Sequence, residues 1–325
     1  MAHHEDVLSS PKSDRVRKVA TLATAKTRRR EGLFLAEGPQ PVREALRAWL
    51  ERYEEPGSDA AAERRSSGSY KPELDALYFD PQALERHSDV ETLLDRVRGV
   101  LFDPQANLPS AGRVFLREAA PEVLEAMGDA ETSQGIIAVC RIPQAQHIPE
   151  GSALVAGLMQ VQDPGNVGTI IRAADAAGAD AVVLSAGSVD PWSPKVVRSA
   201  AGSHFHLPLI TGADAARAAE EARRSGLQVL AADGRGEISL EQMTRAAGAD
   251  ADESGGKERS AEARHEPRAS APTMWLFGNE AHGLGEAERG AADSVVSIPM
   301  YGQAESLNVA AAAAVCLYTS AMAQR

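Results

Sequence analysis

Near its C-terminus the chain reads Ile298-Pro-Met-Tyr-Gly-Gln-Ala-Glu-Ser-Leu-Asn-Val-Ala310, and an alanine-rich run follows. The apolar residues from 295 to 300 predict the end of a buried strand. Pro299 and Gly302 then favour a loop, because proline lacks a backbone N–H for strand pairing and glycine tolerates turn conformations. The stretch therefore predicts a strand that gives way to a loop.

The end of the same stretch predicts the start of a helix. Ser306 stands where the N-cap of a helix over residues 307–323 is expected. Strand, loop and helix N-terminus would bring Glu305, Ser306 and Asn308 together with free backbone N–H groups. α/β proteins use this arrangement to hold small ligands, so we expect a ligand site here.

The second half of the chain alternates apolar runs with helical patterns. Strands are predicted at 153–161, 181–184, 207–210, 228–232 and 273–277, and helices at 165–177, 195–201, 213–225 and 286–291. Repeated strand and helix units with apolar strands predict an α/β fold, with a parallel sheet covered on both faces. This domain would span residues 152–325, with a disordered polar insertion at 246–271.

The first half predicts a smaller α/β domain over residues 1–145, since 325 residues with 43% apolar content favour two domains. A polar, Gly/Ser-rich flexible insertion is expected at 54–71, and a linker at 141–152. Strands are predicted at 32–36, 74–79, 114–116 and 136–140, and helices at 16–25, 41–50, 81–98 and 121–127.

The net charge of −12 argues against a nucleic-acid partner, but this average hides one basic stretch. Eight Lys and Arg residues and a single acidic residue lie between positions 12 and 30. We expect this stretch to contact a polyanion, although a solvated helix face is an alternative. The residues expected to bind RNA are Lys26, Arg28, Arg29 and Arg30.

The two cysteines, Cys140 and Cys316, lie inside apolar runs and have no Cys or His partner at metal-ligand spacing. This indicates buried free thiols in a reducing compartment and no metal site. His204 and His206 lack an accompanying carboxylate or Cys cluster, so we expect a surface or packing role for them. No run approaches the roughly 18 apolar residues that cross a membrane, and the N-terminus lacks the pattern of a signal peptide. We expect a cytoplasmic protein.

Two further stretches place polar residues just after a predicted strand, where open α/β sheets bind ligands. In Gln162-Asp-Pro-Gly-Asn-Val-Gly-Thr-Ile-Ile-Arg172, Asn166 sits at a helix start and Arg172 lies about one and a half turns inside the helix. In Leu276-Phe-Gly-Asn-Glu-Ala-His-Gly-Leu-Gly285, the glycines allow a ligand close to the backbone and Glu280 supplies a carboxylate. The structural alternatives are an Asn N-cap with a surface Arg, and a Gly-rich turn with a solvated Glu.

Together the three stretches resemble the motifs of the SpoU (TrmH) family of RNA ribose 2'-O-methyltransferases, within the SPOUT class. The resemblance covers residues 153–325. Residues 26–46 and 132–139 resemble the start and the end of an L30e-like RNA-binding domain. The matching motifs are Asn166-Val-Gly-Thr-Ile-Ile-Arg172, Leu276-Phe-Gly-Asn-Glu280 with Gly283, and Ile298-Pro-Met300 with Glu305-Ser-Leu-Asn-Val309.

The resemblance implies a knotted (trefoil) parallel-sheet SPOUT domain that follows a smaller L30e-like substrate-binding domain. It also implies S-adenosylmethionine as methyl donor, and a homodimer with its sites at the subunit interface. One departure is Ala310, where the family usually has Ser. By resemblance, the cofactor-binding residues are Leu276, Gly278, Ile298, Met300, Leu307 and Asn308, and the methyl-transfer residues are Asn166, Arg172, Glu280, Ser306 and Asn308.

The chemistry suits these side chains only in part. Methyl transfer from a sulfonium is an in-line displacement, so orienting the ribose 2'-oxygen should supply most of the rate. The hydroxyl must also lose a proton, and a guanidinium with a pKa above about 12 is a poor base. Our hypothesis is that Arg172 holds the adjacent phosphate and lowers the pKa of the hydroxyl, while Glu280 or water receives the proton.

Two other functions fit the sequence less well. A NAD-binding Rossmann enzyme needs a three-glycine loop, and Gly234-Arg-Gly236 lacks the third glycine. A catalytically inactive RNA-binding or ribosome-assembly protein of the same fold is disfavoured by the intact set of polar residues. The L30e-like domain favours 23S ribosomal RNA as substrate, and a tRNA ribose methyltransferase is the alternative. The sequence leaves open whether the role is housekeeping modification or antibiotic resistance.

Overall fold

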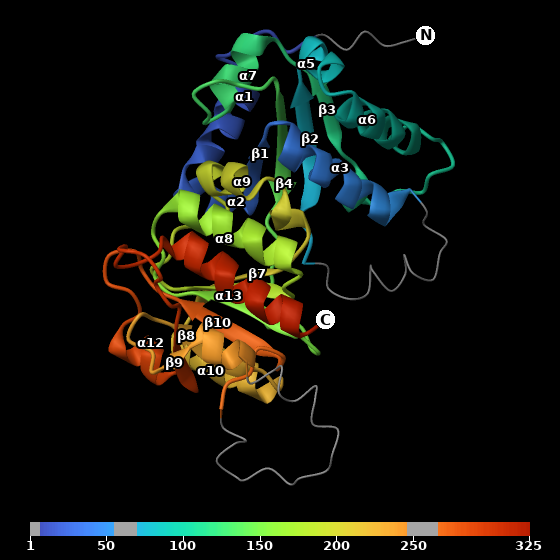
Figure 1. The fold of residues 1–325 in the computed structure, drawn as a ribbon. Helices are drawn as coiled ribbons and strands as arrows, with labels where there is room; N and C mark the ends of the chain where they lie inside the picture. The colour runs from blue at the N-terminus through green and yellow to red at the C-terminus, as the bar shows by residue number, and fades with distance from the viewer. Residues whose placement is uncertain (1–6, 55–69, 246–265) are drawn as a thin grey trace. The chain divides into compact units, whose positions relative to one another are not determined.

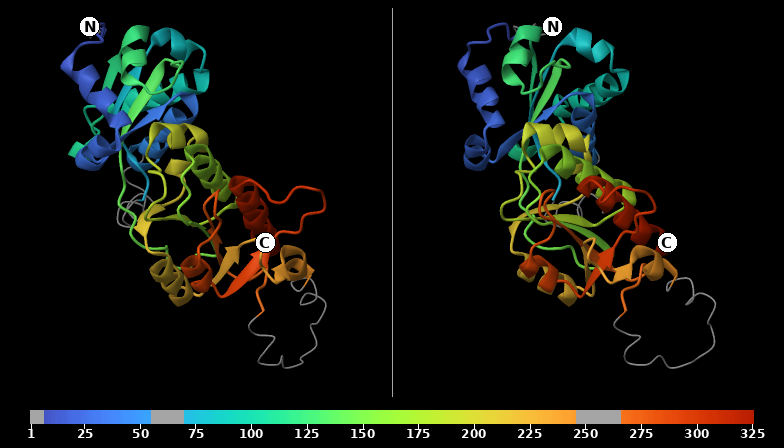
Figure 2. Two further views of the ribbon diagram at one scale, coloured as in Figure 1. Left: turned by 90° about the vertical axis from the view of Figure 1, so that its left-hand side faces the viewer. Right: turned by 60° about the vertical axis from the view of Figure 1, so that its left-hand side comes forward.

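The computed structural model describes residues 7–54, 70–245 and 266–325 (Figure 1). The chain forms two compact units: residues 1–144 with 190–206, and residues 145–189 with 207–325 (Figure 2).

Most of the two predicted insertions, 54–71 and 246–271, lies outside the described residues. The described end of the second insertion is packed, since Pro267 and Ala269 are buried. The Gln228 side chain donates to the Arg268 carbonyl at 2.6 Å and accepts from the Arg268 N–H at 3.2 Å. The predicted disordered insertion therefore ends too far toward the C-terminus. A short segment without large apolar side chains can still be ordered when its backbone is hydrogen-bonded.

The second unit is built on a seven-stranded sheet in the order β7-β6-β5-β10-β8-β11-β9. All of its strand pairs are parallel, which confirms the predicted sheet type. The carboxyl ends of β5, β10, β8 and β11, which are neighbours in the sheet, therefore share one edge. The strands are β5 (Leu154–Leu158), β6 (Ala181–Ser185), β7 (Leu209–Ala213), β8 (Gln228–Ala232), β9 (Ile238–Ser239), β10 (Thr273–Phe277) and β11 (Ser294–Ser297).

Three strands of this sheet depart from the prediction. β7 covers Leu209–Ala213 and not 207–210. β9 has only two residues, too few for an apolar pattern to reveal it. β11 ends at Ser297 and does not continue to Met300. Pro299 accounts for the early end, since a proline cannot donate a hydrogen bond to a neighbouring strand.

Helices cover both faces of the sheet. On one face α8 and α13 lie side by side (Figure 1, Figure 2), and Trp275 of β10 donates to the Ser320 hydroxyl of α13 at 2.9 Å. On the other face Met274 and Leu276 of β10 pack with the buried alanines of α10. Neighbouring residues of β10 thus face opposite layers. The helices are α8 (Pro164–Ala177), α10 (Ala215–Arg224), α12 (Glu286–Gly290) and α13 (Val309–Ala323).

The first unit has a four-stranded sheet in the order β1-β4-β2-β3, in which β4 runs antiparallel to both β1 and β2. α1 and α7 cover one face and bury Val16 and Val123 against Tyr78 and Val139. α3 packs on β2 and β4, and α6 packs against α3. The elements are α1 (Asp14–Ala20), α2 (Ala25–Glu31), β1 (Leu33–Glu37), α3 (Pro39–Tyr53), β2 (Glu73–Phe79), α5 (Pro81–Glu85), α6 (Ser88–Leu101), β3 (Phe115–Glu118), α7 (Pro121–Met127) and β4 (Ile136–Arg141).

The helical predictions in this unit were wrong in three details. The helix expected over 16–25 ends at Ala20 and is followed by a 3-10 turn at 21–23. The helix expected over 81–98 is broken into α5 and α6, because His87 takes a non-helical backbone with φ −130° and ψ 65°. The basic segment that precedes β1 forms its own helix, α2, which was not predicted. Its apolar spacing is weak, since six of its seven residues are polar or charged.

The segment 190–206 belongs to the first unit although it connects β6 to β7 of the second. It contains α9 (Pro194–Ala200) and a short 3-10 turn at 203–205. Phe34 of β1 is completely buried, with Trp192 at 4.9 Å and Phe205 at 6.3 Å between ring centroids. The predicted domain boundary near residues 145–152 did not include segment 190–206 in the first unit. The local sequence does not reveal that its aromatic residues pack against Phe34, which lies far away in the chain.

The L30e-like character of the first unit and the trefoil knot of the second both stay predictions.

Candidate active site

The three predicted stretches meet at the carboxyl edge of the second sheet. They follow β5, β10 and β11, which lie close together in the strand order β5-β10-β8-β11. Open parallel sheets bind their ligands at this edge. The sheet order therefore brings together loops that are separated by more than a hundred residues in the sequence.

Three predicted residues form a hydrogen-bonded relay. The Asn308 amide Nδ2 donates to Asn166 Oδ1 at 3.0 Å, and Asn166 Nδ2 donates to Glu280 Oε1 at 3.0 Å. Each of the three stretches contributes one member. The side chains of Asn166, Glu280 and Asn308 are thus held in one orientation relative to one another.

The relay begins at the first turn of α13. Asn308 is the N-cap of this helix, and its Oδ1 accepts from the N–H groups of Ala310 at 2.9 Å and Ala311 at 3.4 Å. The cap uses the amide oxygen, so the amide nitrogen is left to face Asn166. Ser306 had been predicted as N-cap, and this was wrong, since the helix begins at Val309.

The middle member of the relay, Asn166, is held at the N-terminus of a second helix. Asp163 is the N-cap of α8 and accepts from the Asn166 N–H at 2.8 Å. Asn166 was expected at the start of the helix, and it lies inside the first turn with its side chain free to join the relay. A helix N-terminus favours negative charge nearby, which suits the position of Glu280 opposite this turn.

Glu280 is an ionised carboxylate at neutral pH. Partial burial raises its pKa, but hydrogen bonds from the Asn166 side chain and from backbone N–H groups, including that of Asp163, outweigh burial and bring the pKa below its usual value. Glu280 can therefore accept a hydrogen bond from a hydroxyl group or hold a cationic group near neutral pH.

A cavity of about 800 Å³ lies beside the relay. Small-molecule sites in proteins span roughly 300 to 1,000 Å³, so the cavity has room for a ligand of nucleoside size. Among the described residues, the predicted site residues that line it are Gly278, Glu280, Ile298, Met300, Ser306, Leu307 and Asn308.

Gly278 shows why the lining is rich in glycine. A Cβ at this position would collide with the backbone of Gly283 and Leu284. Asn279 and Gly283 are joined by hydrogen bonds in both directions, at 3.1 and 2.8 Å. The loop after β10 is thus folded tightly on itself, and only glycine fits at its start.

Two predicted residues lie away from the cavity. Leu276 is completely buried inside β10 and packs in the apolar core. Arg172 is exposed on α8, about 120° around the helix from Asn166. Within the described part of the chain, its guanidinium makes no hydrogen bond or ion pair.

The cavity also has a wall that the sequence motifs did not reveal. Residues 232–235, at the end of β8 and in the turn after it, line the cavity between the loops that follow β10 and β11. The signal that could have found them is their position directly after an apolar strand, as at the three predicted stretches.

The basic stretch of the first unit divides into buried and exposed residues. Arg28 is only 3% exposed. Its Nε and Nη2 donate to Asp190 at 3.0 and 2.6 Å, and its Nη1 donates to the carbonyls of Leu22 and Ala23. The expectation that Arg28 binds RNA was therefore wrong, since its donors are used inside the unit. The other three residues of that expectation, Lys26, Arg29 and Arg30, are exposed.

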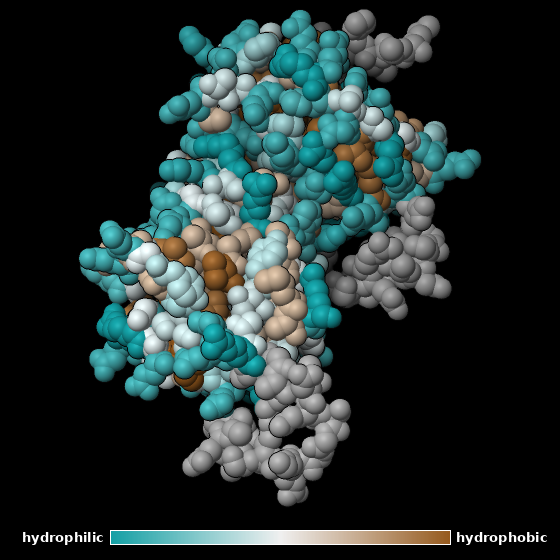
Figure 3. Space-filling model, viewed as in Figure 1, coloured by the Kyte–Doolittle hydropathy of each residue, from teal (hydrophilic) through white to brown (hydrophobic). Residues whose placement is uncertain are grey.

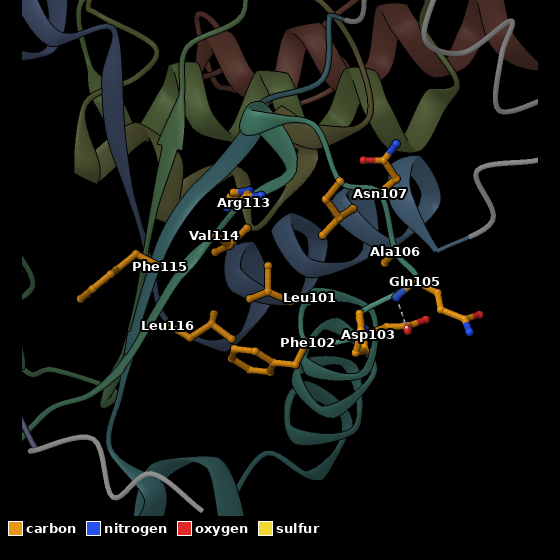
Figure 4. A pocket seen from close by; sticks show the side chains of 12 residues that line it. Leu101, Phe102, Asp103, Gln105, Ala106, Asn107, Arg113, Val114, Phe115 and Leu116 are labelled. Atoms are coloured by element: carbon orange, nitrogen blue, oxygen red, sulfur yellow. Dashed lines mark hydrogen bonds between the residues drawn. The ribbon is translucent and has the colours of Figure 1, made fainter.

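A second hollow, of about 670 Å³, lies in the first unit beside β3, the edge strand of its sheet (Figure 4). Figure 4 shows the ring of Phe102 next to Leu116, while the amides of Gln105 and Asn107 point away from this apolar centre. Phe102 is 70% exposed, an unusual exposure for a phenylalanine. The sequence patterns did not single out this hollow.

No described helix is long and apolar enough to cross a membrane. The described residues contain no group of three or more His, Cys, Asp or Glu side chains placed to hold a metal ion.

Comparisons with known proteins agree with this geometry. The model of the SpoU rRNA Methylase family matches residues 153–318. The 23S rRNA (guanosine(2553)-2'-O)-methyltransferase RlmP of Bacillus subtilis is 32% identical over 224 residues, which are 68% of this chain and 79% of that protein. A 23S rRNA (uridine(2479)-2'-O)-methyltransferase of Streptomyces viridochromogenes is 34% identical over 238 residues, 68% of this chain and 75% of that protein.

Solved structures extend the likeness to nearly the whole chain. The SpoU methyltransferase AviRb from Streptomyces viridochromogenes, in complex with the cofactor AdoMet, matches 96% of this chain and 98% of its own, with a TM-score of 0.67 and 25% identity. An RNA 2'-O ribose methyltransferase matches 98% of both chains, with a TM-score of 0.65 and 25% identity.

Proposed function

Because the chain belongs to the SpoU rRNA methylase family and is an S-adenosylmethionine-dependent RNA ribose 2'-O-methyltransferase, we propose that its substrate is 23S ribosomal RNA. The first unit binds the RNA, and the second unit holds the cofactor and transfers the methyl group. Two copies form a homodimer in the cytoplasm. The similarity to 23S rRNA methyltransferases supports this substrate, and the observation that carries the placement of the methyl-transfer site is the Asn308–Asn166–Glu280 relay beside the cavity.

The cavity suits S-adenosylmethionine in size and in chemistry. Its walls combine apolar residues such as Ile298 and Leu307 with the backbone of glycine-rich loops, and these can hold an adenosyl group without charged partners. When bound, the cofactor supplies an electrophilic methyl group. Gly278, Ile298, Met300, Leu307 and Asn308 are the predicted residues that would hold it.

The relay residues orient the ribose and take up its proton. In the transfer the 2'-oxygen forms a bond to the methyl carbon while the sulfur–carbon bond breaks, and the hydroxyl proton leaves. Glu280, ionised at neutral pH, receives that proton directly or through water. Asn166 and Asn308 fix the carboxylate in place, and Ser306 at the cavity wall contacts the ribose.

The first unit offers surface chemistry that suits RNA. Lys26, Arg29 and Arg30 are exposed cations on one short helix and can contact phosphates. Single-stranded RNA is recognised by stacking on aromatic rings and by hydrogen bonds to base edges. The exposed ring of Phe102 suits stacking, and the amides of Gln105 and Asn107, which line the same hollow, suit hydrogen bonds to base edges.

The outer face of α13 supports the homodimer. Ala311, Val315, Tyr318 and Met322 follow one another at helical spacing, and all four are exposed. Figure 3 shows apolar residues gathered over this helix. An exposed apolar stripe of this kind marks an interaction surface. In the homodimer Arg172, which lies away from the relay of its own chain, serves the relay of the other copy and holds the phosphate of the target nucleotide.

The test is methyl transfer to defined RNAs. Purified protein is incubated with radiolabelled S-adenosylmethionine and, separately, 23S rRNA, 16S rRNA and tRNA, and the labelled ribose is mapped. We expect label at a ribose of 23S rRNA, loss of label with Glu280→Ala, and normal label with Arg217→Ala, an exposed residue of α10. Label on tRNA alone would favour the tRNA alternative. Binding of 23S rRNA without any transfer would favour an inactive RNA-binding protein.

A further inference from the structure

The turn after β8 forms one wall of the cofactor cavity. β8 lies between β10 and β11 in the sheet, so this turn stands between the two motif loops that follow those strands. Ala232, Asp233, Gly234 and Arg235 all line the cavity. None of these residues belongs to the motifs that identified the site.

The turn is fixed to the sheet by its backbone. The Asp233 N–H donates to the Val296 carbonyl of β11 at 3.1 Å, and the Gly236 N–H donates back to the Asp233 carbonyl at 3.0 Å. A Cβ on Gly236 would lie 2.6 Å from the Ser297 nitrogen, so the turn passes directly against β11. A side chain carried by this turn therefore has a defined starting point on the cavity wall.

Asp233 orients the guanidinium of Arg235. The Asp233 side chain is 7% exposed, and its Oδ1 accepts from the Arg235 N–H at 3.0 Å and from Nε at 3.3 Å. Its Oδ2 lies 3.5 Å from Arg289 Nη1, so two cations share one carboxylate. The Arg235 side chain is 68% exposed, and in the described structure its two Nη groups have no partner. An edge of the guanidinium is left for a ligand.

The charges around the cavity indicate which ligand group the Nη edge of Arg235 would bind. Among the described residues that line the cavity, Arg235 is the only Lys or Arg, whereas Asp233, Glu280 and Glu305 are acidic. S-adenosylmethionine carries two positive groups, the sulfonium and the α-ammonium, and one negative group, the α-carboxylate. The carboxylates of the cavity suit the positive groups, and only Arg235 offers a permanent partner to the negative one.

We infer that Arg235 binds the α-carboxylate of S-adenosylmethionine and selects for the intact methionine tail, an inference that rests on the proposed methyltransferase function. Asp233 acts as a positioning residue that holds Nε and leaves the Nη edge toward the ligand. An RNA phosphate is the other anion that could meet this guanidinium, and the experiment separates the two.

The test compares two cofactors that differ by the carboxylate alone. Isothermal titration calorimetry measures the binding of S-adenosylmethionine and of decarboxylated S-adenosylmethionine to the wild-type chain and to Arg235→Ala. We expect Arg235→Ala to weaken the binding of S-adenosylmethionine by about 10- to 100-fold, the effect of losing one charge-assisted hydrogen-bonded pair. The affinity of Arg235→Ala for the decarboxylated cofactor should stay within about twofold of the wild-type value, because this cofactor has no carboxylate for Arg235 to bind.

Two further variants complete the design. Arg235→Lys keeps the charge but not the planar pair of donors, so we expect an intermediate loss of S-adenosylmethionine affinity. Arg217→Ala, which removes an exposed arginine of α10 in the same unit, should leave both affinities unchanged. It is the matched control for the loss of one surface charge.

Other outcomes would overturn the inference. If Arg235→Ala weakened the binding of both cofactors equally, the substitution would have changed the shape of the cavity. Unchanged cofactor affinity with a raised KM for RNA would assign Arg235 to a phosphate. If the wild-type chain bound neither cofactor, the proposed function itself would fail, and that result differs from a failure confined to Arg235.

Discussion

Arg28 and Arg29 are neighbours in α2, yet their guanidinium groups have opposite surroundings. Arg28 is buried against Asp190, whereas Arg29 is exposed. Removing one partner of a buried ion pair leaves the other charge uncompensated, and this typically costs about 3 kcal/mol or more. Removing an exposed charge changes stability by less than about 0.5 kcal/mol.

We therefore expect Arg28→Ala to lower the free energy of unfolding by about 3 kcal/mol in urea titrations, and Arg29→Ala to leave it nearly unchanged. RNA affinity should respond in the opposite way. Arg29→Ala should weaken RNA binding and reduce its dependence on salt by about one phosphate contact. A normal salt dependence in Arg29→Ala would remove that residue from the proposed RNA surface.

His204 makes the stability of the first unit depend on pH. Burial lowers its pKa from the ordinary 6.5 to about 4, against weaker opposing effects of the hydrogen bond to the Pro191 carbonyl and of Asp190. Between these two values the unfolded chain binds a proton that the folded chain does not. The contribution of neutral His204 to the free energy of unfolding is therefore complete above pH 6.5 and is lost as the pH falls toward 4.

The expected loss in free energy of unfolding over that interval is on the order of 3 kcal/mol. His204→Gln is the matched variant, because the Gln amide can still donate to the Pro191 carbonyl but cannot titrate. Chemical denaturation at a series of pH values between 4 and 7 should show a smaller slope for this variant than for the wild-type chain. Parallel slopes would show that His204 is protonated in the folded state.

At the scale of elements, Asn308 joins the stability of α13 to the geometry of the active site. Its Oδ1 caps the helix, and its Nδ2 donates to Asn166. Asn308→Asp keeps an oxygen for the cap but loses the donor, whereas Asn308→Ala loses both. The two substitutions therefore separate capping from orientation of the relay.

We expect Asn308→Ala to lower stability by about 1 kcal/mol, and Asn308→Asp to leave it within about 0.5 kcal/mol. Both should lower kcat at saturating cofactor by about 100-fold, since misplaced polar groups at a reacting centre cost roughly this much. Thermal unfolding and single-turnover methylation are the measurements. Wild-type turnover by Asn308→Asp would show that the contact to Asn166 does not matter for the reaction.

At the scale of the whole molecule, the proposed homodimer raises the question of whether one chain suffices for an active site. If Arg172 serves the relay of the other copy, a mixed dimer of Arg172→Ala and Glu280→Ala chains contains one site with both defects and one with none. We expect each variant alone to be inactive and the mixture to recover part of the wild-type rate, up to about a quarter when the chains mix at random. No recovery, with mixed dimers demonstrated by mass spectrometry, would place Arg172 in the site of its own chain.

Prediction from sequence succeeded where the pattern is local. The apolar strands β5, β8 and β10 and the helices α8 and α10 were found close to their observed limits, because burial on both faces leaves continuous apolar runs. The motif residues Asn166, Glu280 and Asn308 were also found, and the structure brings them within hydrogen-bond distance. Which side chain capped which helix was not found, since Ser306 and Asn308 are both good N-caps by residue type.

The sequence by itself determined the parallel α/β sheet, the family and the three loops proposed to form the active site, because each rests on residues close together in the chain. Only the tertiary structure decided that Asn308 and not Ser306 caps α13, that Arg28 serves the fold and not the RNA, and that the turn at 232–236 completes the cavity. It also assigned segment 190–206 to the first unit. The physical reason is the same in each case: these roles depend on burial and on partners that lie far away in the sequence.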